Sequence, residues 1–473
     1  MRSAPLTDRY RKSSHRLPIA GTVLCLLAAL GSVPAGAQQK TGPGVPPDDS
    51  LTWNGITLYG VVDVGLQYDT HSAPFTPYRP AASGNIVRSN DYQSAFGVTP
   101  SNMGQSRVGL QGTEPLVAGL KAVFQIETFF NPQSGQIADS ARSLTANNGK
   151  PVTSQNIGVD GSSAGQVFQT AFVGVQSERF GSLTFGRQVT LVSEGTRTYD
   201  PNYSATAFGL LGASNTYSGA GSNEDNRLNS TAKYLWSWNH TFHAAGLYQF
   251  NGSNGAGQTA VQADLGITRS GASVDAYYSK ISSAVTGSAL TAAQVQSLPS
   301  GDAVANSLAV TVSDNTTYAL MALYQRDPLK FFAGYMNIKY ANPRNPISAG
   351  TVGLGGYVLA YVNNSAYAQP KILQVYWTGA RYTLIPHLDL TAAYYQVHQS
   401  AYGTSAATVG CTSTAHGSCS GNLEALSFDA DYRFNVHFDI YAGAMYSSVH
   451  GGLGSGYLFS TNINPTLGVR YKF

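Results

Sequence analysis

The sequence predicts an all-β protein, a 16-stranded antiparallel transmembrane β-barrel. Only 11% of the 473 residues are charged, and the chain contains 51 glycines and 29 tyrosines. This composition is unusual for a large soluble enzyme, but it suits many short strands joined by turns, with aromatic side chains at the membrane interfaces. Beyond the N-terminal segment, no apolar run reaches the roughly 18 residues that a membrane-spanning helix needs, so we expect spanning by strands.

The segment 464–473 has the clearest strand pattern. From residue 467 to residue 473, apolar side chains alternate with Gly468, Arg470 and Lys472. Successive side chains of a strand point to opposite faces, so one face would meet lipid and the other water. An ordinary edge strand is the alternative for this segment alone, and the rest of the chain favours a barrel.

The first 37 residues have the pattern of a signal peptide. A basic start precedes the apolar stretch 19–30, and Ala-Gly-Ala at 35–37 is a small-residue cleavage site. Without this segment, which carries five basic residues and one acidic residue, the formal net charge falls from +3 to −1. The positive charge therefore gives no indication of nucleic-acid binding. Residues 38–54 are predicted to be an extended N-terminal segment, and residues 55–473 the β-barrel.

Sixteen segments of the barrel region alternate between apolar and polar residues, as half-buried strands do. In the first of them, Ile56, Leu58 and Val62 share one face, and Tyr59 and Asp63 share the other. The predicted strands are 55–68, 105–112, 120–129, 167–176, 182–188, 227–236, 242–250, 260–268, 273–281, 316–325, 330–340, 371–384, 388–398, 423–434, 438–449 and 464–473.

The connections between these strands alternate in length. Seven are short turns of three to seven residues, and the others are mostly long loops, with 251–259 as the short exception. Short periplasmic turns on one rim and long external loops on the other are typical of outer-membrane barrels. An even strand count closes the sheet without an exposed edge.

Two cysteines, Cys411 and Cys419, lie outside the signal segment. In an exported protein such a pair is expected to form a disulfide. His416 lies between them, but one histidine and two cysteines make a poor zinc site. We therefore predict no metal and no cofactor.

Several motifs resemble the Gram-negative trimeric general porins, beta-proteobacterial type. They are ITLYGVVD at 56–63, SRVGLQGTE at 106–114, GLKAVFQIE at 119–127, AFVG at 171–174, FGSLTFGRQ at 180–188 and GVRYKF at 468–473. The resemblance implies an outer-membrane homotrimer surrounded by lipid and lipopolysaccharide, through which small hydrophilic solutes and ions diffuse passively. It also implies that the outer-membrane assembly machinery recognises the terminal strand through Phe473.

The resemblance further implies a pore constriction, formed where the third long loop, 189–226, folds inward. The loop would supply the acidic residues Glu194 and Asp200. By position, Arg107 and Arg227 match the family's basic residues on the opposite wall. Strand phase adds other charged residues to the lumen: Lys121, Lys233 and Glu127.

Acid facing base across a narrow passage would create a transverse field that favours dipolar solutes. The chain departs from the family twice. It has Gln169 where a third arginine is common, and the loop tip reads AFGLL at 207–211. Both departures leave the ion selectivity open.

Arg187 shares the phase of the apolar residues Leu183 and Phe185, so it should point out of the lumen. An arginine facing lipid near the bilayer midplane is costly. We therefore predict a trimer contact, with Asp139 or Asp160 in the second long loop of a neighbouring subunit as the acidic partner.

Other function classes fit less well. The nine histidines show no catalytic spacing, which argues against an enzyme. A substrate-specific outer-membrane channel with a saturable solute site is the main alternative. It would show an aromatic track or a dense row of basic residues along the lumen. Tyr59, Tyr277 and Tyr335 are candidates for an inward position, but strand phase alone does not make them a track.

Overall fold

The computed structural model describes residues 51–72, 94–117, 119–151, 154–155, 165–214, 216–217, 226–239, 241–250, 258–298, 302–403, 419–454 and 459–473. The predicted signal peptide therefore lies outside the described residues, as do Asp160 and Cys411. Cys419 is disulfide-bonded, and its pairing with Cys411 stays a prediction. No helix among the described residues is long and apolar enough to cross a membrane.

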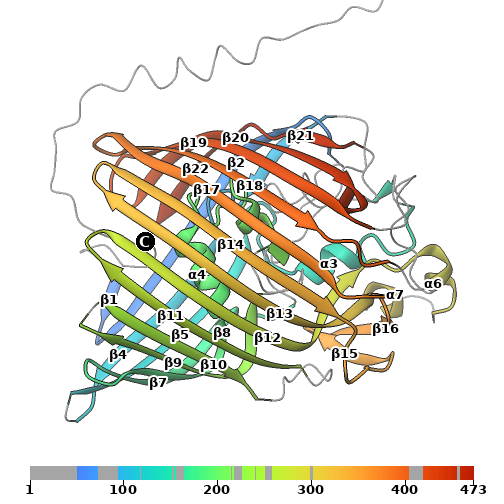
Figure 1. The fold of residues 1–473 in the computed structure, drawn as a ribbon, viewed down its shortest axis with the longest axis horizontal. Helices are drawn as coiled ribbons and strands as arrows, with labels where there is room; N and C mark the ends of the chain where they lie inside the picture. Colours follow the sequence, from blue (N-terminus) through green and yellow to red (C-terminus); the bar gives the residue numbers. More distant parts are fainter. Residues whose placement is uncertain are drawn as a thin grey trace, which may run out of the picture. The chain divides into compact units, whose positions relative to one another are not determined.

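Sixteen of the described strands form one closed antiparallel wall, which confirms the predicted fold (Figure 1). Each strand pairs with the next, and the last pairs with the first. In order they are β2 (Ile56–Asp69), β4 (Arg107–Pro115), β5 (Leu120–Asn131), β7 (Thr170–Ser177), β8 (Gly181–Val189), β9 (Arg227–Trp238), β10 (Phe242–Gln249), β11 (Thr259–Arg269), β12 (Ala272–Ser288), β13 (Ser307–Arg326), β14 (Leu329–Ala341), β17 (Lys371–Ile385), β18 (Leu388–Gln399), β19 (Gly421–Arg433), β20 (Phe438–Gly451) and β22 (Thr466–Lys472).

The barrel closes between β22 and β2. The register pairs Val61 with Lys472 and Gln67 with Thr466. Beyond β22, the Gly60 N–H donates to the Phe473 carbonyl at 2.8 Å, and the Phe473 N–H donates to the Gly60 carbonyl at 3.1 Å. A Cβ on Gly60 would overlap the Phe473 ring, so glycine is needed at this position.

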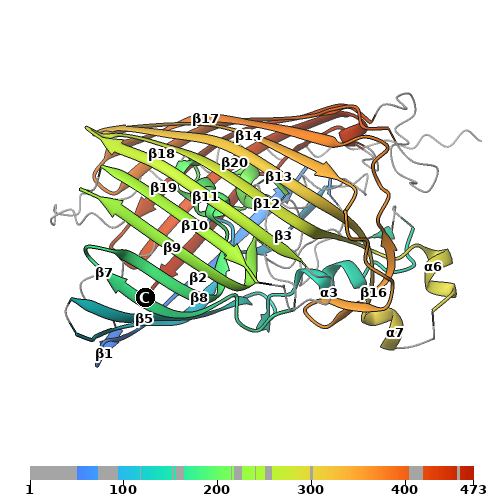
Figure 2. The same cartoon turned by 60° about the horizontal axis from the view of Figure 1, so that its bottom comes forward.

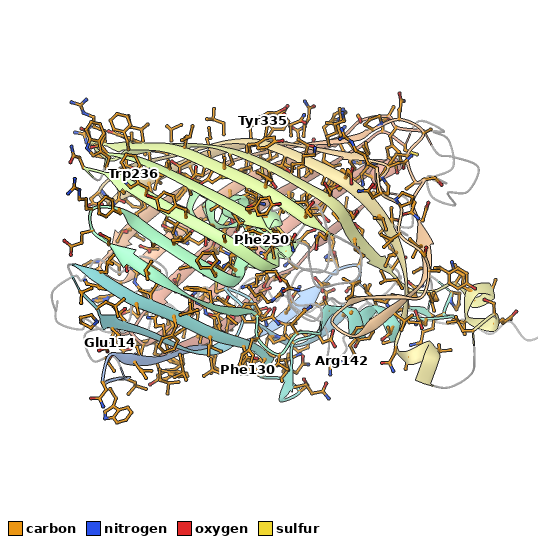
Figure 3. All side chains as sticks on the ribbon, turned by 90° about the horizontal axis from the view of Figure 1, so that it is seen from below. Glu114, Phe130, Arg142, Trp236, Phe250 and Tyr335 are labelled. Carbon is orange, nitrogen blue, oxygen red and sulfur yellow. The ribbon has the colours of Figure 1, made fainter. Side chains whose placement is uncertain are left out.

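Side chains alternate between the two faces of the wall as the sequence predicted. Along β2, Ile56, Leu58 and Leu66 are exposed on the outer face, while Asp63 and Gln67 are buried on the inner face. Figure 3 shows Trp236 and Tyr335 among the side chains of the outer surface. The inward placement considered for Tyr335 is wrong, because it shares the outer face with Tyr376, 4.9 Å away between ring centroids.

Smaller elements gather mainly on the long-loop side. They are β1 (Leu51–Trp53), β3 (Ala95–Pro100), β6 (Gln136–Ile137), α3 (Ser140–Thr145), α6 (Ala292–Gln296), α7 (Asp302–Ala305), β15 (Thr351–Leu354), β16 (Tyr357–Asn363), η5 (Gly452–Gly454) and β21 (Thr461–Ile463). Of these, β1 belongs to the predicted extended segment and pairs with β2. Figure 2 shows α3, α6, α7 and β16 together at one end of the barrel.

The second long loop packs onto this group within its own chain. Ala141 of α3 shares a small apolar cluster with Val285 and Leu308. Asp139 caps α3 by accepting from the Arg142 N–H, and it also accepts from the Tyr357 hydroxyl at 2.8 Å. Asp139, considered above as a partner for a neighbour's Arg187, is thus hydrogen-bonded inside its own subunit.

The third long loop lies inside the ring of strands and carries the helices α4 (Leu191–Tyr199) and α5 (Leu210–Ala213) (Figure 1). Its apolar residues, including Leu191, Tyr199 and Phe208, belong to the main buried cluster. The cluster also contains inward-facing apolar residues of the wall, such as Met336 and Val375. This core holds the loop in the lumen and positions the candidate site.

Candidate functional site

The third loop begins with a capped helix against the inner wall. The Thr190 hydroxyl accepts from the Ser193 N–H at 3.2 Å, which caps the first turn of α4. The Leu191 N–H, also free of a helical partner, donates to Gln262 Oε1 of β11 at 2.7 Å. The wall therefore fixes the helix start, and α4 continues across β11, β12 and β13.

One predicted acid and one predicted base meet at this helix. Lys233 Nζ of β9 pairs with Glu194 Oε1 of α4 and also donates to the Val189 carbonyl at 3.2 Å. The Lys233 side chain is 5% exposed and the Glu194 side chain 44%. The pair ties the loop to the wall and leaves the carboxylate at the water-facing edge.

The middle of the loop is held by three wall strands. Trp377 Nε1 of β17 donates to the Tyr199 carbonyl at 2.9 Å. The Tyr395 hydroxyl of β18 donates to Asp200 Oδ1 at 2.5 Å. Asn202 Nδ2 lies 3.0 Å from both Tyr395 Oη and Ser427 Oγ of β19.

Asp200 was expected to face the pore, and this expectation is not met. It is fully buried, and its second oxygen accepts from the Ser204 N–H at 2.7 Å. Because both oxygens accept hydrogen bonds from the loop and the wall, Asp200 anchors the loop. Strand alternation does not predict which way a loop residue points, so the burial of Asp200 could not be read from the sequence pattern.

The far end of the loop reaches the seam of the barrel. The Ala207 N–H donates to the Asn102 carbonyl at 2.8 Å, and Asn464 Nδ2 donates to the Ala207 carbonyl at 3.0 Å. Phe208 packs edge-on against Tyr441 of β20, with 6.1 Å between ring centroids. The third loop therefore contacts the inner wall from β9 to β20 and the segment just before β22.

The predicted basic residues on the wall have different environments. Arg107 Nε pairs with Glu127 Oε2 at 3.2 Å, and the Tyr59 hydroxyl donates to the same carboxylate at 3.1 Å. Lys121 lies in the same inward phase of β5 as Glu127 and is exposed near the short-turn rim. Arg107, with 31% of its side chain exposed, and Lys121 can act on solutes in the lumen, whereas Glu127 is buried and holds Arg107.

Arg227 was predicted to face the open lumen, but it is buried. It is only 3% exposed, its guanidinium lies 4.5 Å above the Phe129 ring centroid, and it donates to Asn226 Oδ1 at 2.7 Å. The end of the third loop covers it, since Asn226 also donates to Ser193 Oγ of α4 at 2.8 Å. Its role is therefore to position the loop end.

A second charged wall on β17–β22 was missed by the sequence analysis. Arg433 donates to Asp389 at 2.6 Å, Arg470 donates to Asp439 at 2.9 Å, and Lys472 Nζ pairs with Asp439 at 2.7 Å. Further members of this wall are Arg381, Asp429 and Asp431. The alternation that placed Arg107 inside would also have identified these residues.

Arg187 donates to Asn229 Oδ1 of β9 at 2.6 Å. Arg187 is paired with Ala171 of β7, and Phe185, two residues earlier, is paired with Val173. Residues two positions apart on a strand share a face, so Arg187 lies on the same outer face as Phe185 and Val173. The outward phase is thus as expected, and the trimer contact stays a prediction.

Burial raises the pKa of Asp200 to about 6, although the hydrogen bonds from Tyr395 and Ser204 and the nearby Arg381 oppose the shift. The docked loop therefore favours the neutral acid. The free energy that favours the docked loop is largest below about pH 4, where Asp200 is neutral whether or not the loop is docked. This stabilisation is lost as the pH rises through 6, and the docking free energy then weakens by about 3 kcal/mol.

We accordingly expect fewer open-channel fluctuations at pH 5 than at pH 8. Planar-bilayer recordings of the wild type and Asp200→Asn check this. The variant stays neutral, so it should be as quiet at both pH values as the wild type is at pH 5. If the variant keeps the full pH dependence, another group is responsible, with Asp429 the nearest candidate.

A family model described as Gram-negative porin matches residues 20–452. An outer membrane porin protein of Bordetella pertussis is 33% identical over 146 residues, 31% of this chain and 31% of that relative. Outer membrane porin protein 32 of Delftia acidovorans is 27% identical over 187 residues, 39% of this chain and 41% of that relative. The matched stretches thus span about a third to two fifths of these curated relatives.

Solved structures share the fold at low identity. An anion-selective porin from Comamonas acidovorans is 16% identical with a TM-score of 0.57, covering 88% of this chain and 99% of that chain. OmpT of Vibrio cholerae is 14% identical with a TM-score of 0.56, covering 90% of this chain and 100% of that chain.

Proposed function

Because this chain belongs to the Gram-negative porin family, we propose that it forms a water-filled channel through the outer membrane. Ions and small hydrophilic solutes would diffuse through it passively. The third loop carries this proposal, since it is pinned inside a closed barrel and carries Glu194, which is paired with Lys233 of the wall and is 44% exposed. A narrowed lumen of this kind selects by size and charge without chemical change, so the protein is proposed to be a channel and not an enzyme.

A substrate-specific channel is supported less well. Tyr59 and Tyr277 face inward, but each donates a hydrogen bond to a carboxylate, Glu127 and Asp275 respectively. Tyr335 lies on the outer face. These three residues therefore form no continuous aromatic track, and the paired charges favour a general channel.

We also propose a homotrimer in contact with outer-membrane lipid and lipopolysaccharide. A solved form of Vibrio cholerae OmpT is described as a trimer. In this chain the outward-facing Arg187 supports such an assembly, because burial between subunits would remove its guanidinium from lipid. Recognition of Phe473 by the assembly machinery and removal of residues 1–37 belong to the same proposal.

Planar-bilayer recordings of the purified protein test the function and the assembly together. We expect conductance that rises linearly with salt concentration, and closure in three equal steps after each insertion. Conductance that saturates with one solute would favour a specific channel, and single-step closure would contradict the trimer. An absence of any current would contradict the porin function.

Replacing Arg107 with glutamine should shift permeability toward cations, because Glu127 then lacks its cationic partner. Reversal potentials in a salt gradient measure this effect. It should be clear near 0.1 M salt and fade near 1 M, where the Debye length is only about 3 Å. Arg107→Lys retains the charge and should behave like the wild type. Equal reversal potentials for all three proteins at low salt would contradict a role in selectivity.

A further inference from the structure

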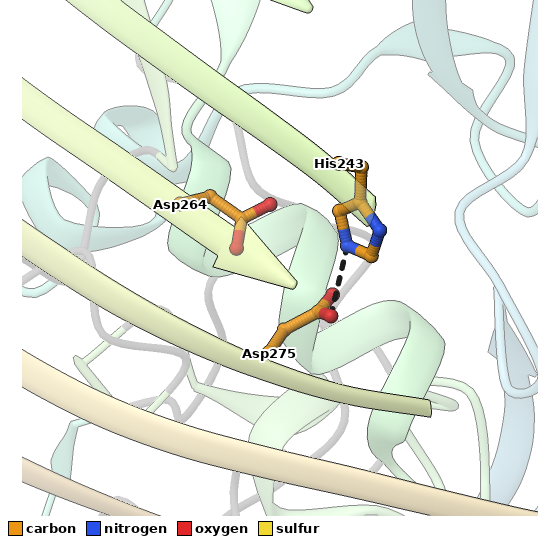
Figure 4. Close-up of side chains that lie close together, drawn as sticks. All are labelled: His243, Asp264 and Asp275. Carbon is orange, nitrogen blue, oxygen red and sulfur yellow. Dashed lines mark ion pairs between the residues drawn. The ribbon is translucent and has the colours of Figure 1, made fainter. Parts of the chain in front are cut away.

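Three side chains with metal-ligating atoms meet on the inner wall, apart from the pairs described above. They are His243 of β10, Asp264 of β11 and Asp275 of β12, from three neighbouring strands (Figure 4). One ligand atom from each lies within 4.8 Å of those of the other two. His243 Nε2 and Asp275 Oδ1 form an ion pair at 2.8 Å.

The register and one glycine bring these atoms together. Gly266 lies between the two ion-paired residues, opposite His243 on one side and opposite Asp275 on the other. A Cβ on Gly266 would overlap both His243 Nε2 and Asp275 Oδ1. The missing side chain therefore creates the space in which an imidazole and a carboxylate converge.

The two buried carboxylates of this cluster have too few hydrogen-bond donors or cations around them in the part of the chain that the structure describes. Asp264 is 8% exposed, and its buried Oδ1 has no hydrogen-bond partner among the described residues. Asp275 is 5% exposed, and its Oδ2 accepts from the Tyr277 hydroxyl at 3.0 Å, which turns Oδ1 toward His243. A buried carboxylate oxygen without a partner is costly, and a bound cation would remove that cost.

We propose that His243, Asp264 and Asp275 bind a divalent transition-metal ion of the zinc class. One imidazole nitrogen and two carboxylate oxygens form a three-ligand set that leaves a fourth position for water, as in open zinc sites. Calcium and magnesium prefer oxygen ligands alone, so the histidine selects against them. The two carboxylates together balance the charge of the ion.

The geometry requires adjustments in both directions, because the ligand atoms lie between 2.8 Å and at most 4.8 Å apart and Asp264 would have to move toward the other two ligands. Zinc ligands at about 2.0–2.1 Å in a tetrahedral arrangement lie about 3.4 Å apart. The His243–Asp275 contact would therefore widen by roughly half an ångström as the ion replaces the shared proton. Tyr277 would hold Asp275 in place, as hydrogen bonds to metal ligands commonly do.

The position of the site links it to the third loop. A Cβ on Gly195 of α4 would overlap the Tyr277 ring, so the ring that supports Asp275 packs directly under the helix. Glu194 of the same helix lies close enough to act electrostatically on Asp264. A bound ion would add positive charge beside the loop and favour anions in the channel.

Metal titration of the full folded protein, purified in detergent without a histidine tag, tests the proposal. After removal of metal, we expect one Zn²⁺ per chain by calorimetry, and Co²⁺ should give the intense visible absorption of a four-coordinate site. His243→Ala and Asp264→Asn should each weaken Zn²⁺ binding at least about tenfold. His398→Ala is the matched control, because this histidine lies on the exposed face of β18.

Gly266→Ala keeps every ligand but fills the space between them, so it should also weaken binding at least about tenfold. Trimer migration on gels confirms that each variant is folded. Wild-type protein that binds no Zn²⁺ would overturn the proposal. So would variants that bind as the wild type does, or equal loss in the His398 control. Conductance in metal-free buffer tests the channel function separately.

Discussion

Replacing Trp377 with alanine is expected to release the third loop from the wall and raise the single-channel conductance. The indole is buried and donates its N–H to the Tyr199 carbonyl, at the junction of α4 and the loop middle. Truncating a buried tryptophan costs about 3–5 kcal/mol. The loop should therefore populate undocked positions that widen the passage. Planar-bilayer recordings measure the conductance, and limited proteolysis measures the exposure of residues 191–213.

Two variants separate this effect from general damage. Tyr376→Ala changes the neighbouring residue on the outer face and should leave the conductance unchanged. Gly334→Val should mimic the loss of Trp377, because any side chain at position 334 would overlap the indole. A folded Trp377→Ala protein with wild-type conductance and a protected loop would show that the loop is held elsewhere.

Replacing Arg470 with methionine is expected to lower barrel stability by about 3–5 kcal/mol. Its guanidinium donates to both oxygens of Asp439 and to Asp431 Oδ2. Both carboxylates are buried, so the variant leaves them without their main cation. Methionine preserves most of the side-chain volume, which limits the change to charge and hydrogen bonding. Urea unfolding in detergent, followed by tryptophan fluorescence, measures the loss.

Arg326→Met is the matched control, because Arg326 is exposed at a short turn and should lose less than about 0.5 kcal/mol. The double variant Arg470→Met/Asp439→Asn should recover part of the loss, since it also removes the unpaired charge. If Arg470→Met unfolds at the same urea concentration as the wild type, the second charged wall contributes little to stability.

The strands of the barrel wall could be predicted from the sequence more fully than the environments of the side chains inside the barrel. All sixteen barrel strands were predicted, because alternation has the same period as the strand itself. The environments of Asp200 and Arg227 were not, because the docked loop buries both. His243, Asp264 and Asp275 escaped notice because each is an unremarkable polar residue on its own strand. Only the register of three strands brings them together.

Part of the inner wall also departs from the simple alternation. On β13, β14 and β17 the inward positions include Met321, Met336 and Val375, all fully buried in the cluster with the third loop. Here both faces of a strand are apolar, one toward the outside and one toward the loop. A pattern of this kind in a barrel sequence indicates a wall covered by protein and not by water.

Ala207 has a consequence for the order of assembly. Its carbonyl accepts from Asn464, just before the last strand, and its N–H donates to Asn102, just after a strand paired to the first one. The same residue thus binds, from inside the barrel, one segment next to the first strand of the wall and one next to the last. Both hydrogen bonds of Ala207 can form only when the first and last strands of the wall are in place. The third loop can therefore reach its final position only as the barrel closes. A barrel that has not closed would have no defined channel width. Closure of the wall and fixing of the channel width are therefore a single step of assembly.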